Sequence, residues 1–347
     1  MEGKNEKTVN FLKAVRCKNP DWIPARIGIM PATWKKYRED LEHIVKAHPA
    51  LFPDANENHD YDFIAQPSYR LGKYVDHWHC VWNNVEEGLE GLVVGHPLGD
   101  WDNLESFVPP TVPSDDDAFW LDVKRRFERE KREGNLAHGG MEHGFMYMRL
   151  FYLRGFEYFM LDVAMKDPRL DTVIDMVLGY NLAMVKKQLE LGAELMDFGD
   201  DLGTQRSLPI SPSDWRRYLK PCYDSIFGAC RDAGAIVRMH TDGHILPIID
   251  DLIECGVDIL NPQIRANGLY NLVDICKGKV CVDLDLDRQL FPFATPSQIH
   301  DHVKEAIDAF APDNGGLMLY AECEPDIPLE NIVALCESLE RYALGME

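Results

Sequence analysis

The chain has 347 residues and a formal net charge of −22, with acidic residues spread along its length. Such a charge excludes nucleic acid and anionic lipid as natural partners, because the surface would repel both. The sequence contains no run near the roughly 18 apolar residues of a membrane helix, and its N-terminus has no apolar stretch of signal-peptide length. These features, with nine scattered cysteines that fit the free thiols of a reducing compartment, predict a cytoplasmic protein.

The first half of the chain is less regular than the second. Apolar segments predict strands at residues 22–31, 73–82 and 144–153. Residues 32–72 and 83–135 are irregular, and the stretch "NNVEEGLEGLVVGHPLGDWDNLESFVPPTVPSDDD" is typical of an elaborated loop with short elements. Because the sequence shows no internal repeat and no linker, we expect one domain over residues 1–347.

From residue 194 onward, strand-like and helix-like segments alternate. The predicted strands lie at 194–201, 235–240, 257–262, 279–286 and 316–323. Two of the helices that follow carry start signals, Ser211 before Pro212 and Thr295 before Pro296. With the three earlier strands the total is eight, which predicts an α/β protein with a (β/α)8 TIM barrel and elaborated N-terminal loops and helices. A doubly wound open sheet is the alternative, although no GxGxxG motif follows the first strand.

Almost every predicted strand of the second half ends in a residue that can bind a metal or a proton. These residues are Asp200 and Asp201, His240 and Asp242, Asn261 and Gln263, Asp283, Asp285 and Asp287, and Glu322 and Cys323. In barrels and open parallel sheets, chemistry takes place at the carboxyl ends of the strands. The pattern therefore predicts an active site at this end.

The segment "VRMHTDGHI" suggests a metal site. His240 and Asp242 are two residues apart, so on an extended segment their side chains point the same way, and Gly243 lets the backbone turn sharply after them. With the distant Cys323 they form a plausible three-ligand zinc site with an open fourth position, which is the catalytic arrangement. The alternative is that Asp242 caps the next helix while His240 is a core residue.

Other side chains are expected to contact the substrate. They are Met30, Trp78, His79, Asp200 and Gln205. Simpler roles are open for some of them. Asp200 and Asp201 could cap their loop, and His79 could belong with His77 to the polar face of a hairpin.

Several motifs together resemble the uroporphyrinogen decarboxylase superfamily. They are "GDDLGTQRSLPISPSDWRRYLKP", "HTDGHILPIIDDLIECGVDILNPQ", "LFPFATPSQI" and "CEPDIPLENI", in this order. The stretch "WNNVEEGLEGLVVGHPLGDWDNLESFVPP" is similar to the methyltransferase-like branch, and the resemblance runs from about residue 20 to the end. It implies a (β/α)8 barrel with its active-site cleft at the carboxyl ends of the strands.

The superfamily contains cofactor-free decarboxylases and zinc-containing methyltransferases that work with a corrinoid. The decarboxylases carry an arginine-rich N-terminal motif, whereas the first strand here, "ARIGIMPATWKKY", offers Arg26 and nothing like that motif. The methyltransferases hold zinc by a histidine and a cysteine two residues apart and by a second cysteine near the last strand. The resemblance thus implies His240, Asp242 and Cys323 as ligands, with Asp242 replacing a thiolate by a harder carboxylate.

A zinc with a harder ligand set should be the stronger Lewis acid, which suits a leaving oxygen better than a bound thiol. The resemblance therefore implies a corrinoid-dependent demethylase that moves methyl from a methoxy compound, such as an aryl methyl ether, to the Co(I) of a separate corrinoid protein. Asp201, Glu322 and His143 are the candidates for an acid or for orienting the substrate. The sequence contains no cobalamin-binding DxHxxG motif, so the corrinoid (cobalamin) is expected on a partner chain.

Three alternatives remain open from the sequence. They are a zinc-dependent methylcobalamin:thiol methyltransferase, a cofactor-free decarboxylase, and a non-catalytic corrinoid-binding or scaffold protein. Barrels of this family often pair, so a homodimer is also an expectation.

Overall fold

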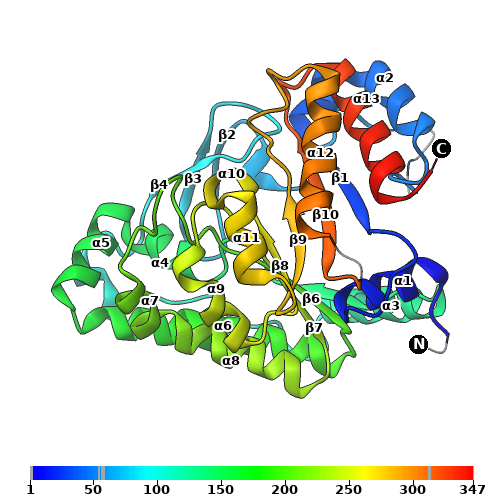
Figure 1. Cartoon of the computed structure of the whole chain (residues 1–347). Coiled ribbons are helices and arrows are strands. Elements are labelled where there is room, and N and C mark those ends of the chain that lie inside the picture. The colour runs from blue at the N-terminus through cyan, green and yellow to red at the C-terminus, as the bar shows by residue number, and fades with distance from the viewer. Residues whose placement is uncertain (1–2, 54, 56–58, 312–313, 347) are drawn as a thin grey trace.

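A computed structural model describes residues 3–53, 55, 59–311 and 314–346. Within these residues the main sheet has seven parallel strands, in the order β1-β10-β9-β8-β7-β6-β5. The strands are β1 (Ala25–Ile29), β5 (His138–Gly140), β6 (Leu195–Gly199), β7 (Ile236–Thr241), β8 (Ile259–Pro262), β9 (Cys281–Asp285) and β10 (Leu317–Cys323). The sheet curls into an open barrel (Figure 1), which confirms the predicted α/β fold of the TIM-barrel type.

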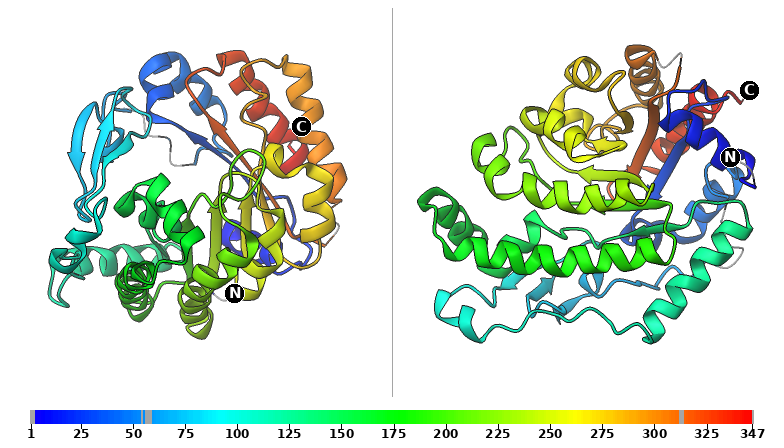
Figure 2. Two further views of the ribbon diagram at one scale, coloured as in Figure 1. Left: turned by 90° about the vertical axis from the view of Figure 1, so that its left-hand side faces the viewer. Right: turned by 90° about the horizontal axis from the view of Figure 1, so that it is seen from below.

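Helices surround the curled sheet (Figure 2). They are α1 (Glu6–Val15), α2 (Pro31–Ala47), α3 (Ala118–Arg132), α4 (Tyr147–Arg154), α5 (Phe156–Met165), α6 (Arg169–Glu190), α7 (Pro212–Tyr218), α8 (Lys220–Asp232), α9 (Ile249–Cys255), α10 (Ile264–Asn267), α11 (Leu269–Cys276), α12 (Pro296–Phe310) and α13 (Leu329–Ser338). Short 3-10 turns lie at Pro67–Tyr69, Trp101–Ser106 and Leu246–Ile248, and a π-turn at Leu339–Ala343. None of the described helices combines the length and apolar character of a bilayer span.

Two of the eight predicted barrel strands lie elsewhere. Residues 73–82 fall in a separate antiparallel sheet of β2 (Gly72–Val75), β3 (Val81–Asn84) and β4 (Leu92–Gly95). Residues 144–153 are largely helical, in α4, and the barrel strand before them is the short β5. The barrel therefore has two edge strands, β1 and β5, which are not paired with each other among the described residues.

The helix at α4 depends on a carboxylate from far along the chain. Asp200, directly after β6, is fully buried and accepts the backbone N–H groups of Met146 (3.2 Å), Tyr147 (2.5 Å) and Met148 (2.8 Å). These are the unpaired donors of a helix start, which an acidic side chain satisfies well. The Tyr223 hydroxyl donates a fourth hydrogen bond to Asp200, at 2.7 Å. The apolar segment at 144–153, whose own sequence predicts a strand, therefore forms the start of a helix.

Both predicted helix starts are confirmed. Ser211 accepts the backbone N–H of Asp214 at 3.0 Å, and Thr295 forms a capping box with Gln298. The segment after Ser211 forms two helices, α7 and α8, because Pro221 has no N–H to continue the first.

The two faces of the central strands differ in chemistry. Met239 of β7 and Leu284 of β9 are fully buried, and both belong to the apolar core. Their neighbours on the opposite face, His240 of β7 and Asp285 of β9, belong to a network of polar and charged groups. Because successive side chains alternate across a strand, the barrel interior receives charged groups while the core lies outside it.

We expect Asp200→Asn to lower the free energy of unfolding by about 3 kcal/mol, because the amide leaves buried N–H groups of α4 without an acceptor. Urea unfolding followed by circular dichroism measures this loss. The matched control is Asp201→Asn, whose side chain is partly exposed, and which we expect to change stability by less than about 1 kcal/mol. Equal unfolding midpoints for the two variants would contradict the assignment.

Candidate active site at the carboxyl ends of the strands

The polar groups predicted at the strand ends gather around His240 of β7. Its Nδ1 lies 2.8 Å from Oδ1 of Asn261 on the neighbouring strand β8. The amide nitrogen of Asn261 donates to the carbonyl of Asp283, so its oxygen must face the imidazole. Nδ1 of His240 is therefore the donor, and Nε2 is left to face the acidic groups of the site.

Two carboxylates face this Nε2 or lie close to it. Asp242 Oδ1 is 3.2 Å from His240 Nε2, and Asp285 projects from β9. Burial would lower the pKa of His240, but the hydrogen bond to Asp242 and the nearby carboxylates raise it. Burial also raises the pKa of Asp285 to about 7 in spite of the nearby Arg288. One oxygen of Asp285, Oδ1, is buried without a hydrogen-bond partner among the described residues.

Arg288 is the cation that balances this cluster. Its guanidinium pairs with Asp285, lies 2.8 Å from Glu322 Oε1, and is 3.5 Å from Asp242 Oδ1. The other oxygen of Glu322 accepts the Tyr320 hydroxyl at 2.7 Å. Glu322 is thus fixed at the site, as expected, with both of its oxygens already engaged.

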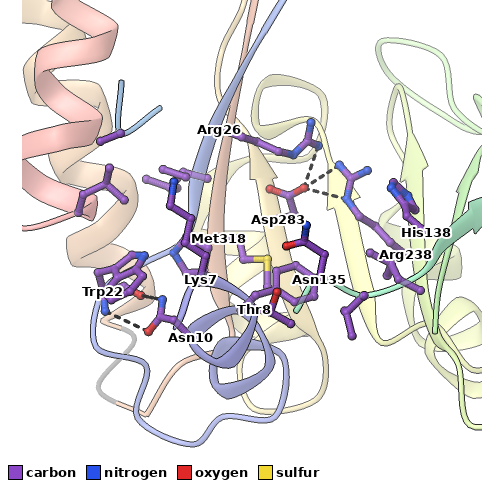
Figure 3. Close-up of a pocket in the computed structure, with 18 of the residues that line it drawn as sticks. Lys7, Thr8, Asn10, Trp22, Arg26, Asn135, His138, Arg238, Asp283 and Met318 are labelled. Atoms are coloured by element: carbon purple, nitrogen blue, oxygen red, sulfur yellow. Dashed lines mark hydrogen bonds and ion pairs between the residues drawn. The ribbon is translucent and has the colours of Figure 1, made fainter. Parts of the chain in front are cut away.

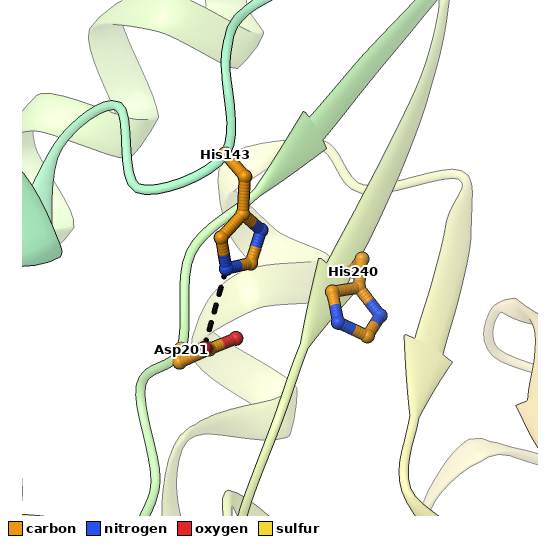
Figure 4. A group of neighbouring side chains, drawn as sticks. All are labelled: His143, Asp201 and His240. Atoms are coloured by element: carbon orange, nitrogen blue, oxygen red, sulfur yellow. Dashed lines mark hydrogen bonds and ion pairs between the residues drawn. The ribbon is translucent and has the colours of Figure 1, made fainter. Parts of the chain in front are cut away.

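His143 and Asp201 face each other beside His240 (Figure 4). His143 Nε2 is 3.2 Å from Asp201 Oδ2, and the rings of the two histidines are 5.8 Å apart between centroids. Removal from water would lower the pKa of His143, but the Asp201 hydrogen bond and the surrounding carboxylates raise it to about 9. The second oxygen of Asp201 accepts the backbone N–H of Asp242 at 3.2 Å, which joins the two halves of the site.

The loops that carry Asp201 and Asp242 touch at two glycines. Gly243 has a φ of +83°, and a Cβ added there would lie 2.2 Å from the backbone of Gly203. A side chain at either glycine would push the two loops apart. The sharp turn expected at Gly243 is therefore present, and the close contact adds a second reason for glycine.

This donor set fits a divalent cation. The described residues contain two groups whose ligand atoms all lie within 4.8 Å of one another, and both include His240. The first adds His143 and Asp201, and the second adds Asp242 and Asp285. Imidazole nitrogen and carboxylate oxygen are ordinary zinc ligands, and the unpartnered Oδ1 of Asp285 has a lone pair to offer.

The structure departs from the predicted ligand set at Cys323, which is in neither group. Tyr320 and Glu322 share the inner face of β10, so Cys323 lies on the outer face by alternation. It is fully buried in the apolar core, where burial raises the pKa of its thiol to about 12. Its neighbour there is Cys336 of α13, whose pKa is raised by burial and by Cys323. Asp285 takes the place near His240 that Cys323 was expected to fill.

The other expected contacts are scattered. Gln205 is exposed and lines a cavity of about 660 Å³ at the barrel mouth together with Asp242 and Arg288. Trp78 and His79 do not line this cavity. The Trp78 ring is 1% exposed and packs edge-on against Tyr180, while His79 is exposed with Nε2 3.2 Å from the Val108 carbonyl.

Two further residues that were expected to contact the substrate make contacts within the fold. Met30 precedes α2, and its backbone N–H donates to the Cys323 carbonyl at 3.1 Å. Asp200 caps α4, as described above, and burial raises its pKa to about 6. All four of its hydrogen bonds are to the start of α4 and to Tyr223, and none is to a group at the mouth of the barrel.

Three features of the site were not predicted from the sequence: Asn261 as the partner of His240, Arg288, and Glu90. Arg288 could have been found, since it follows the acidic strand end "VDLDLD" and such a buried cluster needs a cation. Glu90 comes from the region read as a loop, between β3 and β4, and its charge contributes to the raised pKa of His143. The connection between β3 and β4 thus adds negative charge near His143.

The placement of Cys323 predicts thiol reactivity. Eight of the nine cysteines are buried and Cys17 is exposed, so we expect native protein to take up one N-ethylmaleimide, at Cys17, and denatured protein to take up nine. Mass spectrometry of digests locates the adducts. Rapid modification of Cys323 in native protein would place its sulfur at the accessible mouth and contradict this structure.

Comparison with known proteins agrees with the architecture. The chain is 24% identical over 368 residues to uroporphyrinogen decarboxylases of Bacillus cereus (strain G9842) and Bacillus thuringiensis (strain Al Hakam), with 92% of this chain and 94% of theirs covered. A solved methyltransferase from Methanosarcina mazei matches with a TM-score of 0.64 and 19% identity, over 97% of this chain and 98% of that one. The family model for uroporphyrinogen decarboxylase (URO-D) matches residues 94–342. The chain therefore belongs to the uroporphyrinogen decarboxylase family.

Proposed function

We propose that this protein is a corrinoid-dependent methyltransferase, the demethylase component that moves a methyl group from a methoxy compound to the Co(I) of a separate corrinoid protein. The observation that carries the proposal is the convergence of His240, Asp242 and Asp285 at the barrel mouth. The methyltransferase from Methanosarcina mazei shares the fold along nearly the whole chain. An aryl methyl ether is the methyl donor that we favour.

The proposed zinc ligands are His240 Nε2, Asp242 and Asp285. The first two agree with the sequence-based set, and Asp285 replaces Cys323 because its unpartnered oxygen lies beside them. A bound zinc would supply Lewis acidity toward the ether oxygen that leaves. Three ligands, none of them a thiolate, suit this role better than activation of a thiol.

The chain's own residues would then bind the donor and manage the proton. His143 holds a proton near the site because its pKa is raised to about 9, and Asp201 orients its ring. When the bond between the methyl group and the ether oxygen breaks, that oxygen keeps the electron pair, and His143 would donate a proton to it. Glu322, held by Arg288 and Tyr320, would position the substrate. The 660 Å³ cavity beside Asp242 has the volume of a typical small-molecule site.

Decarboxylation of a porphyrinogen is the second candidate, favoured by the names of the Bacillus relatives. The charges of the barrel interior disfavour it. The three arginines there, Arg26, Arg238 and Arg288, are each already paired with a carboxylate. A polycarboxylate substrate would have to displace these ion pairs, and unpaired acidic groups would repel it.

The proposed ligand set predicts which variants lose zinc. We expect His240→Ala and Asp285→Asn to lose bound zinc, whereas Cys323→Ala retains it. Asn261→Ala should weaken zinc binding about 10- to 100-fold, because the imidazole loses the partner that orients it. Metal analysis of gel-filtered protein and chelator competition measure both effects.

The matched control for metal content is Asp287→Asn. Asp287 lies two residues beyond Asp285 but pairs with Arg265 outside the metal group. It should leave zinc content unchanged. Zinc lost in Cys323→Ala and kept in Asp285→Asn would restore the sequence-based set, and wild-type protein without affinity for zinc would rule out the site.

The reaction itself predicts consumption of Co(I). Incubation with Co(I) cobalamin and 2-methoxyphenol, a neutral aryl methyl ether, should bleach the Co(I) absorption and release catechol. His143→Gln should slow this about 100-fold, because the leaving oxygen loses its proton donor. Methyl transfer from methylcobalamin to thiols, with none from methoxy donors, would favour the reverse reaction. Release of CO2 from uroporphyrinogen, with no methyl transfer, would favour the decarboxylase.

A further inference from the structure

A second cavity, of about 630 Å³, lies at the amino-terminal end of the barrel strands (Figure 3). It is lined by residues that begin strands, such as Ala25 of β1 and Leu195 of β6, and by residues of α1. Asn135 and His138 line it from the β5 side and Ala25 and Arg26 from β1, so the cavity reaches both edge strands of the sheet. The volume lies within the range of small-molecule sites.

The polar groups of this cavity carry an excess of positive charge. Lys7, Arg26 and Arg238 line it, against the carboxylates of Asp197 and Asp283. Both carboxylates are engaged by Arg238, at 2.9 Å for Asp197 and 2.7 Å for Asp283. The surplus is notable because the whole protein has a net charge of −22. An anion that avoids most of this surface would be attracted here.

Two of these cations have hydrogen-bonding capacity to spare. Lys7 is exposed and has no ion-pair or hydrogen-bond partner in the part of the chain that the structure describes. Arg26 makes one ion pair, from Nη2 to Asp283 at 3.0 Å, and its guanidinium stacks over Tyr320 at 3.8 Å from the ring centroid. Its side chain is 46% exposed, so its remaining N–H donors can reach a ligand.

Thr8, Asn10, Asn135 and His138 add neutral polar groups to the wall, and most of the rest of it is apolar. Phe11, Trp22, Met318 and Leu319 line the cavity, which therefore combines a cationic part with a surface that favours an apolar body. Such a combination binds amphipathic molecules, since burial of the body adds to the ion pair.

We propose that this cavity is a second ligand site, which takes a small carboxylate with a flat apolar body and pairs its anionic group with Lys7 and Arg26. The amino-terminal face of a TIM barrel ordinarily serves stability. Here that face instead contains a cavity whose lining carries two cations with donors to spare. The proposal stands on these contacts and does not depend on the proposed methyl transfer.

The two sites share a polar contact path. Arg238 lines the amino-terminal cavity and donates from Nη2 to Asn261 Oδ1 at 3.1 Å. The same Asn261 oxygen accepts from His240 at 2.8 Å. A ligand that contacts Arg238 would therefore be separated from His240 by one residue, Asn261.

The test is binding of naphthoate to full-length protein, measured by isothermal titration calorimetry. We expect saturable binding of about one naphthoate per chain, weakened by added salt because an ion pair contributes. The neutral naphthamide should bind about tenfold more weakly, and the cationic naphthylmethylamine more weakly still. Lys7→Ala should weaken naphthoate binding about fivefold to tenfold, and Lys7→Arg should restore it.

Two controls separate this cavity from other surfaces. Lys277→Ala removes an exposed lysine that does not line the cavity and should leave the affinity unchanged. His240→Ala alters the candidate active site, and because Asn261 and Arg238 stand between His240 and the cavity, it should change the affinity by less than about twofold. The proposal is overturned if naphthoate binds no more tightly than naphthamide, if the Lys7 and Lys277 variants behave alike, or if binding is lost in His240→Ala.

Discussion

The structure depends on how the barrel interior neutralises its buried charge. Asp283, 2% exposed, sits between Arg26 and Arg238, and Arg238 also pairs with Asp197. An unpaired charge at this depth would cost several kcal/mol, so each group holds its neighbours in place. Asn261 extends this network to His240 and fixes which imidazole nitrogen faces the acidic groups. The orientation of His240 in the candidate active site therefore depends on the ion pairs deeper in the barrel, through Arg238 and Asn261.

The two ends of the barrel differ in charge because of how these pairs are distributed. Near the mouth, Arg288 is surrounded by Asp242, Asp285 and Glu322, so acidic groups outnumber the cation. At the amino-terminal end, Lys7 and Arg26 have N–H donors without partners among the described residues, while Asp197 and Asp283 are already paired with arginine. A cation bound at the mouth would offset the excess negative charge there, and an organic anion at the opposite end would offset the excess positive charge. One network of alternating charges therefore supports two sites with opposite preferences.

The sequence predicted the second half of the fold well, because its strands are short apolar runs separated by helices with local start signals such as Ser211 and Thr295. It failed where a distant residue decides the local structure. Residues 144–153 read as a strand, but Asp200, more than fifty residues later, caps the helix that they form. The segment at 73–82 does not form one strand but covers most of β2, a turn and the start of β3, and no local signal shows that these two strands pair with each other instead of closing the barrel. Pairing partners are set by tertiary contacts, which a single sequence does not display.

The candidate site could likewise be predicted only in part, because its details depend on tertiary contacts. That His240, Asp242, Asp201 and Glu322 come together follows from parallel strands ending at one edge, which alternating apolar and polar segments reveal. Which neighbour reaches His240 depends on side-chain parity within each strand. Asp285 shares the inner face of β9 with Asp283, whereas Cys323 is one residue out of step with Glu322 on β10. A shift of one residue moves a side chain from the barrel interior to the apolar core. The carboxylate of Asp285 follows Asp283 at the strand period, so parity alone makes it a better candidate for a third ligand than Cys323. A zinc ion held by carboxylates in place of thiolates would be the stronger Lewis acid.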